Sequence, residues 1–198
     1  MIKCLIGLEI PDSGTIEIMS QKLEHLSLKA LDEIRADIGF LFQGSALYDS
    51  MTVRENLEFP LRRHISKFGN VKDTLPLVEE ALENVGLKNV IDLMPNELSG
   101  GMKRRVALAR TLILKPKIII YDEPTTGLDP ITSKEIILLM KSVQEKYKTS
   151  SIIITHDVDC ARVIANRMIL LIDGKNYAEG TFAELSTSQD PKVKAFFK

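Results

Sequence analysis

The stretch from Leu98 to Pro130 reads LSGGMKRRVALARTLILKPKIIIYDEPTTGLDP. Ser99-Gly100-Gly101 opens a helix, so backbone N–H groups and the positive helix end point toward an anion. An apolar strand, Ile118 to Tyr121, then delivers Asp122 and Glu123 at its C-terminal end. Open α/β sheets bind their ligands at that end of the strands. The stretch therefore predicts an α/β protein with a phosphate-directed site.

The composition is that of one ordinary globular domain. The chain has 198 residues, of which 44% are hydrophobic and 27% are charged. Its formal net charge of −1 gives no global basic field, so we expect no nucleic-acid partner. Cys4 and Cys160 lack metal-type spacing and indicate a reducing compartment. No apolar run has the length that spans a bilayer, so we expect a cytosolic chain that meets the membrane only through a partner.

Short apolar strands alternate with helices, which is typical of a mostly parallel sheet covered on both faces. Strands are expected at 15–19, 38–42, 118–121, 152–154 and 168–172, with a hairpin turn into 177–181. Helices are expected at 27–36, 52–63, 75–85, 133–147 and 158–166, and again from about 191. Residues 1–44 and 113–198 are therefore expected to form the α/β core, and residues 45–112 an inserted helical sub-domain.

Each half of the 98–130 stretch also has a simpler interpretation. Asp122-Glu123 suits a nucleotide hydrolase in which the aspartate holds Mg²⁺ and the glutamate polarises water. The same pair can equally be an acidic turn that ends a strand. Ser99-Gly100-Gly101 lets the backbone approach a phosphate, although GG pairs also begin ordinary capped helices. The two motifs together, joined by one helix and a Lys-Pro turn, favour the nucleotide site.

This combination resembles the signature motif and the Walker B motif of ABC-type ATPases, and the resemblance covers nearly the whole chain. It implies a P-loop NTPase-like (RecA-like) parallel-sheet core with an inserted helical sub-domain, and ATP and Mg²⁺ as ligands. It also implies that Asp122 binds the metal and that Glu123 is the catalytic base. Ser99, Gly100 and Gly101 would contact the nucleotide held by a second copy in a homodimer.

Three further positions match motifs of this family in the family's order. Gln43, at the end of a strand, matches the Q-loop glutamine, which touches Mg²⁺ and water. Asp129, in Thr126-Gly127-Leu128-Asp129, matches the D-loop aspartate at the dimer interface, and a helix cap is its simpler role. His156 matches the switch histidine, which contacts the γ-phosphate. Without the other motifs, a strand-end glutamine or histidine would be interpreted as structural.

A closer resemblance is to the ATPases of Mla/Mce-type lipid transporters. It rests on Met102 in place of the glutamine usual after SGG, and on FQGSALYDSMTV at 42–53, DPITS at 129–133 and DPKVKAFF at 190–197. It implies a membrane permease and an Mce-domain substrate-binding protein as partners, and a location at the cytoplasmic face of the inner membrane. The implied cargo is phospholipid or a related lipid. The alternatives are a non-catalytic ABC domain that docks on a permease and the ATPase of a transporter for another substrate.

The sequence contains no G-x-x-x-x-G-K-[S/T] loop. Residues 2–8 resemble a buried helix that follows that loop in the family, so the core is expected to be N-terminally incomplete. The strand that carries the loop is expected beside Ile118 to Tyr121, where its loss would leave backbone edges and apolar surface open. We expect the chain as written to bind ATP weakly and to hydrolyse it poorly.

Two further features allow more than one interpretation. Lys103-Arg104-Arg105 suggests anionic lipid headgroups or nucleic acid, but consecutive positions splay around a helix and favour a solvated or dimer-facing cluster. Tyr48 and Met51 either line a groove for a permease helix or pack inside the helical sub-domain.

Overall fold

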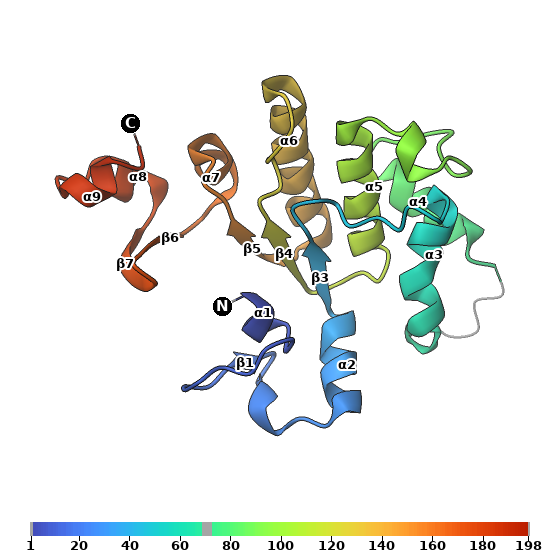
Figure 1. Ribbon diagram of the computed structural model, residues 1–198, viewed down its shortest axis with the longest axis horizontal. Coiled ribbons are helices and arrows are strands. Elements are labelled where there is room, and N and C mark those ends of the chain that lie inside the picture. Colours follow the sequence, from blue (N-terminus) through green and yellow to red (C-terminus); the bar gives the residue numbers. More distant parts are fainter. Residues whose placement is uncertain (1, 69–72, 198) are drawn as a thin grey trace.

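A three-stranded parallel sheet lies at the centre of the computed structural model, which describes residues 2–68 and 73–197 (Figure 1). Its order is β3 (Ile38–Leu41), β4 (Ile118–Asp122), β5 (Ser150–Ile154), and both pairings are parallel. In the central strand β4, Ile119, Ile120 and Tyr121 are at most 1% exposed, as expected for an apolar run covered on both faces. The α/β fold expected from the sequence is confirmed.

Three helices pack side by side next to the sheet, with α6 in contact with both of the others. They are α5 (Gly100–Leu112), α6 (Pro130–Tyr147) and α7 (Val158–Ile164) (Figure 1). The approach of α5 to β3 depends on Gly39. A Cβ atom on that residue would lie 2.6 Å from Cγ2 of Thr111 on α5. No real Cβ tolerates that distance, so only glycine allows the helix to pack this closely on the strand.

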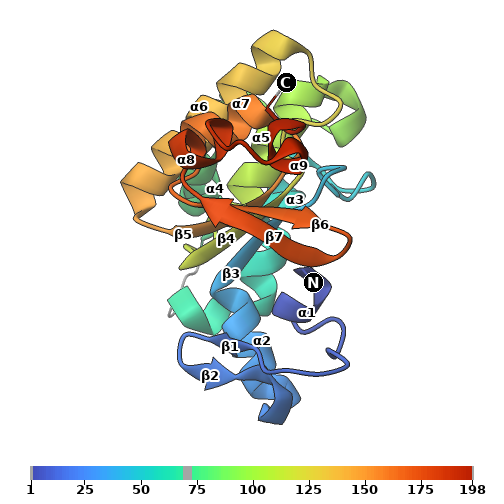
Figure 2. The ribbon, with the colours of Figure 1, turned by 90° about the vertical axis from the view of Figure 1, so that its left-hand side faces the viewer.

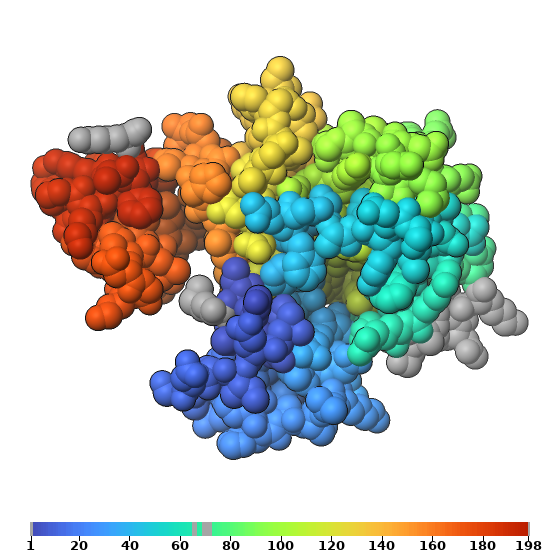
Figure 3. Space-filling model, viewed as in Figure 1, coloured from blue at the N-terminus to red at the C-terminus, as the bar shows by residue number. Residues whose placement is uncertain are grey.

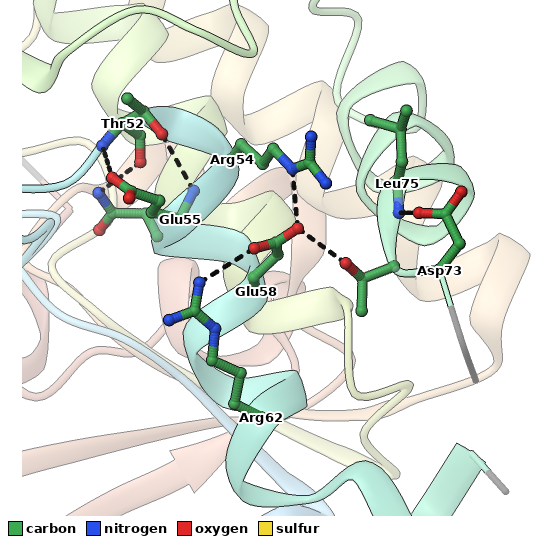
Figure 4. A network of polar contacts seen from close by, with 9 residues as sticks. Thr52, Arg54, Glu55, Glu58, Arg62, Asp73 and Leu75 are labelled. Carbon is green, nitrogen blue, oxygen red and sulfur yellow. Dashed lines mark hydrogen bonds and ion pairs between the residues drawn. The ribbon is translucent and has the colours of Figure 1, made fainter. Parts of the chain in front are cut away.

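Between β3 and β4, the regular elements in the described part of the chain are all helices, joined by loops. They are α3 (Val53–Arg63), α4 (Leu75–Glu83) and α5, with short 3-10 helices at Ile65–Phe68 and Pro95–Glu97. The expected capping box at the start of α3 is confirmed, because Thr52 and Glu55 bond to each other's backbone N–H (Figure 4). Buried side chains of these helices and of the sheet form one continuous cluster. Packing alone therefore does not divide the chain, and the sub-domain limits at 45 and 112 stay a prediction.

The N-terminal part lies below the sheet in Figure 1 and includes α1 (Ile2–Leu5), the paired strands β1 (Glu17–Ile18) and β2 (Gln21–Lys22), a 3-10 helix at Leu23–His25 and α2 (Leu28–Ala36). The sequence predicts a buried helix at residues 2–8. That prediction is wrong, because α1 has four residues and none of them is buried. Arg35 of α2 holds the following turn instead, by donating to the carbonyls of Ile6 and Gly7 at 2.9 and 2.8 Å.

The C-terminal part forms a separate lobe, at the left of Figure 3 and in front in Figure 2. The antiparallel hairpin of β6 (Met168–Ile172) and β7 (Lys175–Gly180) turns at Asp173-Gly174, as predicted, with φ of +50° and +72°. The helices α8 (Phe182–Ser186) and α9 (Pro191–Lys194) pack on it. Its own small core consists of the buried side chains Leu170, Leu185 and Val193.

One expected feature of the sheet is wrong. The strand of a glycine-rich loop was expected beside residues 118–121, but β4 is already paired on both edges, with β3 and β5. Within the described residues, β3 and β5 are the two edge strands of this sheet, and each is paired only with β4. Apolar side chains are exposed on β5 and β6, with Ile152 at 40%, Ile169 at 54% and Leu171 at 51%.

Among residues 2–68 and 73–197, no helix combines the length and the apolar character needed to cross a bilayer.

Candidate active site

The C-terminal edge of the central sheet gathers four of the residues singled out in the sequence. Gln43 comes two residues after β3, Asp122 and Glu123 lie at the end of β4, and His156 comes two residues after β5. The register sets Leu41 beside Tyr121 and Asp122 beside Ile154. Since neighbouring strands lie about 4.8 Å apart, the four residues share one edge of the sheet. Ligands of open α/β sheets bind at this edge.

Glu123 occupies a strained turn and is held from two sides. Its φ of +48° lies in the left-handed region, which residues with a side chain rarely adopt. Its N–H donates to the carbonyl of Ile154 at 2.9 Å, which fixes the turn to the end of β5. Its carboxylate lies 2.9 Å from Nδ1 of His156 and accepts a hydrogen bond from Oγ1 of Thr126 at 3.1 Å. The glutamate therefore has a fixed position at the sheet edge.

His156 pairs with Glu123 while it faces solvent. Its side chain is 79% exposed, and the hydrogen bond to the Glu123 carboxylate raises the pKa of the imidazole. The next residue, Asp157, caps α7 by accepting from the N–H groups of Asp159 and Cys160. Asp157 also accepts a hydrogen bond from Oγ1 of Thr125 at 3.0 Å. The turns after β4 and β5 are thus joined by two side-chain contacts.

Asp122 and Gln43 leave their polar groups available to a ligand. Within the described residues, neither side chain makes a hydrogen bond or an ion pair, and no group of three or more His, Cys, Asp and Glu side chains could hold a metal. Mg²⁺ commonly takes one or two protein oxygens and fills its other positions with water and substrate phosphates. One carboxylate and one amide on neighbouring strands fit that pattern, and they do not fit an all-protein metal cage.

Ser99, Gly100 and Gly101 lie at a different place, at the start of α5. Ser99 caps the helix by accepting from the N–H of Met102 at 3.2 Å. A Cβ on Gly101 would lie 2.7 Å from Cγ2 of Thr132, so the first turn of α5 packs against α6. The contacts of these glycines go to Leu128 and Thr132. The structure therefore does not bring this motif onto Glu123 or His156 of the same chain.

Asp129 is the N-cap of α6. Its carboxylate accepts hydrogen bonds from the N–H groups of Ile131 and Thr132 and from the hydroxyl of Thr132. The hydroxyl of Thr132 and these N–H groups lower the pKa of Asp129. The simpler role predicted for Asp129, a helix cap, is confirmed.

Comparison with known proteins identifies the family. The family model described as ABC transporter matches residues 1–126, which is more than half of the chain. The chain belongs to the ABC transporter family. Its order of motifs along the sequence agrees with this membership.

Individual ABC proteins resemble the whole chain. The intermembrane phospholipid transport system ATP-binding protein MlaF of Haemophilus influenzae is 40% identical over 198 residues, which are 100% of this chain and 74% of MlaF. The methionine import ATP-binding protein MetN of Campylobacter jejuni is 35% identical over 210 residues, and the match covers 99% of this chain and 62% of MetN. The dimeric ATP-binding cassette MJ0796, solved in a post-hydrolysis state with ADP and Pi, matches with a TM-score of 0.80 and 34% identity, over 91% of this chain and 78% of MJ0796.

These likenesses establish the general function of the chain and its fold. The chain is an ATP-binding subunit of the ABC transporter type, with the P-loop NTPase fold of an ABC cassette. ABC ATPases as a family bind ATP with Mg²⁺ and hydrolyse it.

The basic run Lys103-Arg104-Arg105, which follows Ser99-Gly100-Gly101, is less exposed than the sequence predicts. Arg104 is only 3% exposed, so the prediction of a solvated or dimer-facing cluster is wrong for this residue. Arg105 donates to the carbonyl of Val85 and to Glu135, both at 2.9 Å, within the same chain. The sequence could have predicted the burial of Arg104 from helical spacing. Arg104 is four residues before Leu108 and eight before Leu112, so it shares a helix face with two residues that are buried on α5.

The loop after β3 is held rigidly and exposes aromatic side chains. The buried side chain of Asn56 accepts from the N–H of Tyr48 and donates to the carbonyls of Tyr48, Met51 and Thr52. The ring of Tyr48 is 43% exposed and lies 4.8 Å from that of Phe59, which is 41% exposed. Tyr48 therefore lies at the surface of this ABC cassette.

Proposed function

We propose that this ABC subunit drives the transport of phospholipid or a related lipid between envelope membranes. The observation that carries the proposal is the 40% identity to MlaF over the full length of the chain. Met102, which follows the SGG motif where an ABC signature usually has glutamine, supports the same assignment.

In this proposal, the sheet edge is the hydrolytic site. Asp122, with Gln43, would hold Mg²⁺, which supplies positive charge beside the phosphates when it is bound. Glu123 accepts the proton of the attacking water. His156 keeps the Glu123 carboxylate oriented and faces the γ-phosphate. The hydrogen bonds from Thr126 and His156 to Glu123 support this arrangement, since a catalytic base must be fixed in place.

We further propose that two copies act together. Ser99, Gly100 and Gly101 of one copy would contact the nucleotide of the other, and Asp129 would face the interface while it caps α6. The separation of this motif from Glu123 within one chain supports the arrangement, as does the likeness to MJ0796, which was solved as a dimer with ADP and Pi.

The partners follow from the same proposal. Residues 45–112 would form the helical sub-domain, and its surface at Tyr48, Met51 and Phe59 would receive a helix of the permease. An Mce-domain protein would deliver or accept the lipid, and the ATPase would lie at the cytoplasmic face of the inner membrane. The exposed ring of Tyr48, on the loop fixed by Asn56, and the neighbouring ring of Phe59 on α3 support this surface, because rigid aromatic side chains bind partners at little entropic cost.

We also propose that these 198 residues alone bind ATP weakly and hydrolyse it slowly. A phosphate loop of the form G-x-x-x-x-G-K-[S/T] normally cradles the phosphates, and the sequence contains none. Nucleotide titration and phosphate release on the purified 198-residue chain test this. Micromolar affinity together with ordinary turnover would contradict it.

The cargo is tested by isolating the transporter complex through a tag on this chain. Its bound organic molecules are extracted and separated by lipid chromatography and amino-acid analysis. We expect phospholipid in stoichiometric amounts, and we expect ATP turnover to respond to phospholipid vesicles. Bound methionine, or turnover that responds to methionine and not to lipid, would favour the second candidate, a transporter like the one that MetN serves. A complex that binds lipid and shows no ATP turnover would favour the non-catalytic docking alternative.

A further inference from the structure

Arg104 connects α5 to the turn that carries Gln43. Its Nη1 donates to the carbonyl of Phe42 at 2.7 Å, and its Nη2 donates to the carbonyl of Gln43 at 2.5 Å. Nη2 also lies 3.4 Å from the carbonyl of Thr126. One guanidinium from the signature helix therefore bonds to the backbone after β3 and reaches the turn after β4.

The environment of Arg104 is unusual for an arginine that only stabilises packing. Its side chain is 3% exposed, and no carboxylate lies within 4.0 Å of it in the described part of the chain. Its Nε is buried and has no hydrogen-bond partner among the described residues. A buried charge without a counter-ion is costly, and an apolar side chain would fill the same space more cheaply. What Arg104 provides, and an apolar side chain would not, is the set of hydrogen bonds to the carbonyls of Phe42 and Gln43.

These contacts continue to Glu123. The Thr126 residue whose carbonyl faces Arg104 also donates its hydroxyl to the Glu123 carboxylate, and Glu123 pairs with His156. Arg110, six residues further along α5, donates to the carbonyl of Ser45 at 3.2 Å and supports the same loop. The turn after β3 and the turn after β4 thus share one anchor on α5.

We propose that Arg104 is a positioning residue for the ATPase site: it fixes the backbone of Gln43 against the Thr126 turn and so sets the spacing between the Gln43 amide and the Glu123 carboxylate. This inference rests on the proposed roles of Gln43 and Glu123. A guanidinium suits the task because its planar fork can donate to two carbonyls at once, whereas a lysine ammonium is a single point of charge.

Hydrogen exchange of the 198-residue chain without nucleotide tests the anchor directly. The N–H of Ser45 donates to the Phe42 carbonyl, and its exchange reports the order of the turn. We expect Arg104→Gln to speed exchange in peptides covering residues 40–48 by about tenfold, the equivalent of losing about one charged hydrogen bond. The exchange rate of these peptides in Arg104→Lys should lie between the rates in the wild type and in Arg104→Gln. Arg105→Gln is the matched control, since it removes a neighbouring arginine with two bonds elsewhere, and it should leave this segment unchanged.

Turnover by the transporter complex separates positioning from general stability. We expect Arg104→Gln to lower kcat about tenfold in the wild-type background and to have no further effect on kcat in a Gln43→Ala background. A merely structural arginine would lower kcat by the same factor in both backgrounds, which would overturn the proposal. Unchanged exchange at residues 40–48 in Arg104→Gln would also overturn it. A wild-type complex that hydrolyses no ATP refutes the proposed function, while the exchange measurement still decides whether Arg104 anchors the turn.

Discussion

Glu58 offers a prediction about stability that needs no nucleotide. This buried glutamate of α3 is 11% exposed in its side chain and accepts hydrogen bonds from three groups (Figure 4). Oε1 accepts from Nε of Arg54 at 2.8 Å and from Oγ1 of Thr74 at 2.7 Å, and Oε2 accepts from Nη2 of Arg62 at 3.1 Å. Thr74 immediately precedes α4, so the carboxylate links α3 to α4. The perturbation is Glu58→Gln, which keeps the shape of the side chain.

The expected loss follows from what the amide can still do. An NH₂ group replaces Oε2 and faces the Arg62 guanidinium, so two donors oppose each other, and the charge that Arg54 and Arg62 share disappears. A hydrogen bond to a charged group contributes about 1.5–3 kcal/mol, whereas exposed ion pairs contribute about 0–1 kcal/mol. Arg54 and Arg62 are 42% and 63% exposed, so the effect lies between these limits. We expect Glu58→Gln to lower the free energy of unfolding by about 1–2 kcal/mol at pH 7.

The pH dependence gives a second readout. Burial raises the pKa of Glu58, but the hydrogen bonds from Arg54, Thr74 and Arg62 outweigh it and hold the pKa below its usual value. A carboxylate whose pKa is lowered in the folded state contributes stability above its unfolded pKa of about 4.3, and this is lost as the pH falls through the folded value. The difference between the wild type and Glu58→Gln should therefore be complete at pH 7 and shrink below about pH 4.

Urea unfolding of the wild type and Glu58→Gln, at pH 7 and at a pH below about 4, measures both differences in the free energy of unfolding. The control is Glu79→Gln, the same substitution at an exposed residue of α4 that makes no hydrogen bond or ion pair in the described ranges. It should stay within about 0.5 kcal/mol of the wild type. Equal stability of Glu58→Gln and the wild type at pH 7 would show that the Glu58 charge does not stabilise the contact between α3 and α4, as would a difference that does not change with pH.

Three further substitutions probe the site. Thr126→Val removes the hydroxyl that bonds to Glu123 and should lower the kcat of the complex about tenfold, and an unchanged kcat would show that the contact is dispensable. Gly101→Ala places a Cβ 2.7 Å from the Thr132 side chain and should cost about 1–3 kcal/mol of unfolding free energy, whereas a neutral result would mean that α5 and α6 separate freely. Asp129→Ala removes the cap of α6 and should cost about 1 kcal/mol, measured by urea unfolding; an unchanged stability would contradict its role as a cap.

The sequence predicted the elements of the core and the residues at its C-terminal edge. Isoleucine runs of strand length and a capping box identified β4, β5 and α3, and the polar residues that follow the strands came with them. These are local signals. A parallel sheet then brings the strand ends to one edge, so Gln43, Asp122, Glu123 and His156 could be placed together without coordinates.

Long-range relations were beyond the sequence. The apolar pattern shows that a strand is buried without naming its neighbours, so the pairing of β4 on both edges was missed. The contacts of Arg104 reach Phe42, 62 residues away, and Thr126, 22 residues away. The splay of consecutive residues around a helix suggested a solvated or dimer-facing cluster there, whereas the four-residue spacing between Arg104 and Leu108 indicated burial. The four-residue spacing was the better guide, because residues four apart lie on the same face of a helix and are covered together.

Glu123, at the end of β4, is proposed to be the catalytic base of this ABC ATPase. ATP turnover of the transporter complex, measured with the wild-type chain and with Glu123→Gln, tests that role. We expect the variant to retain nucleotide binding and its kcat to fall by about 100-fold or more, the range that a positioned general base contributes. Asp159→Asn, on the exposed start of α7, is the matched control and should keep the wild-type rate. Equal turnover in Glu123→Gln and the wild type would contradict the assignment.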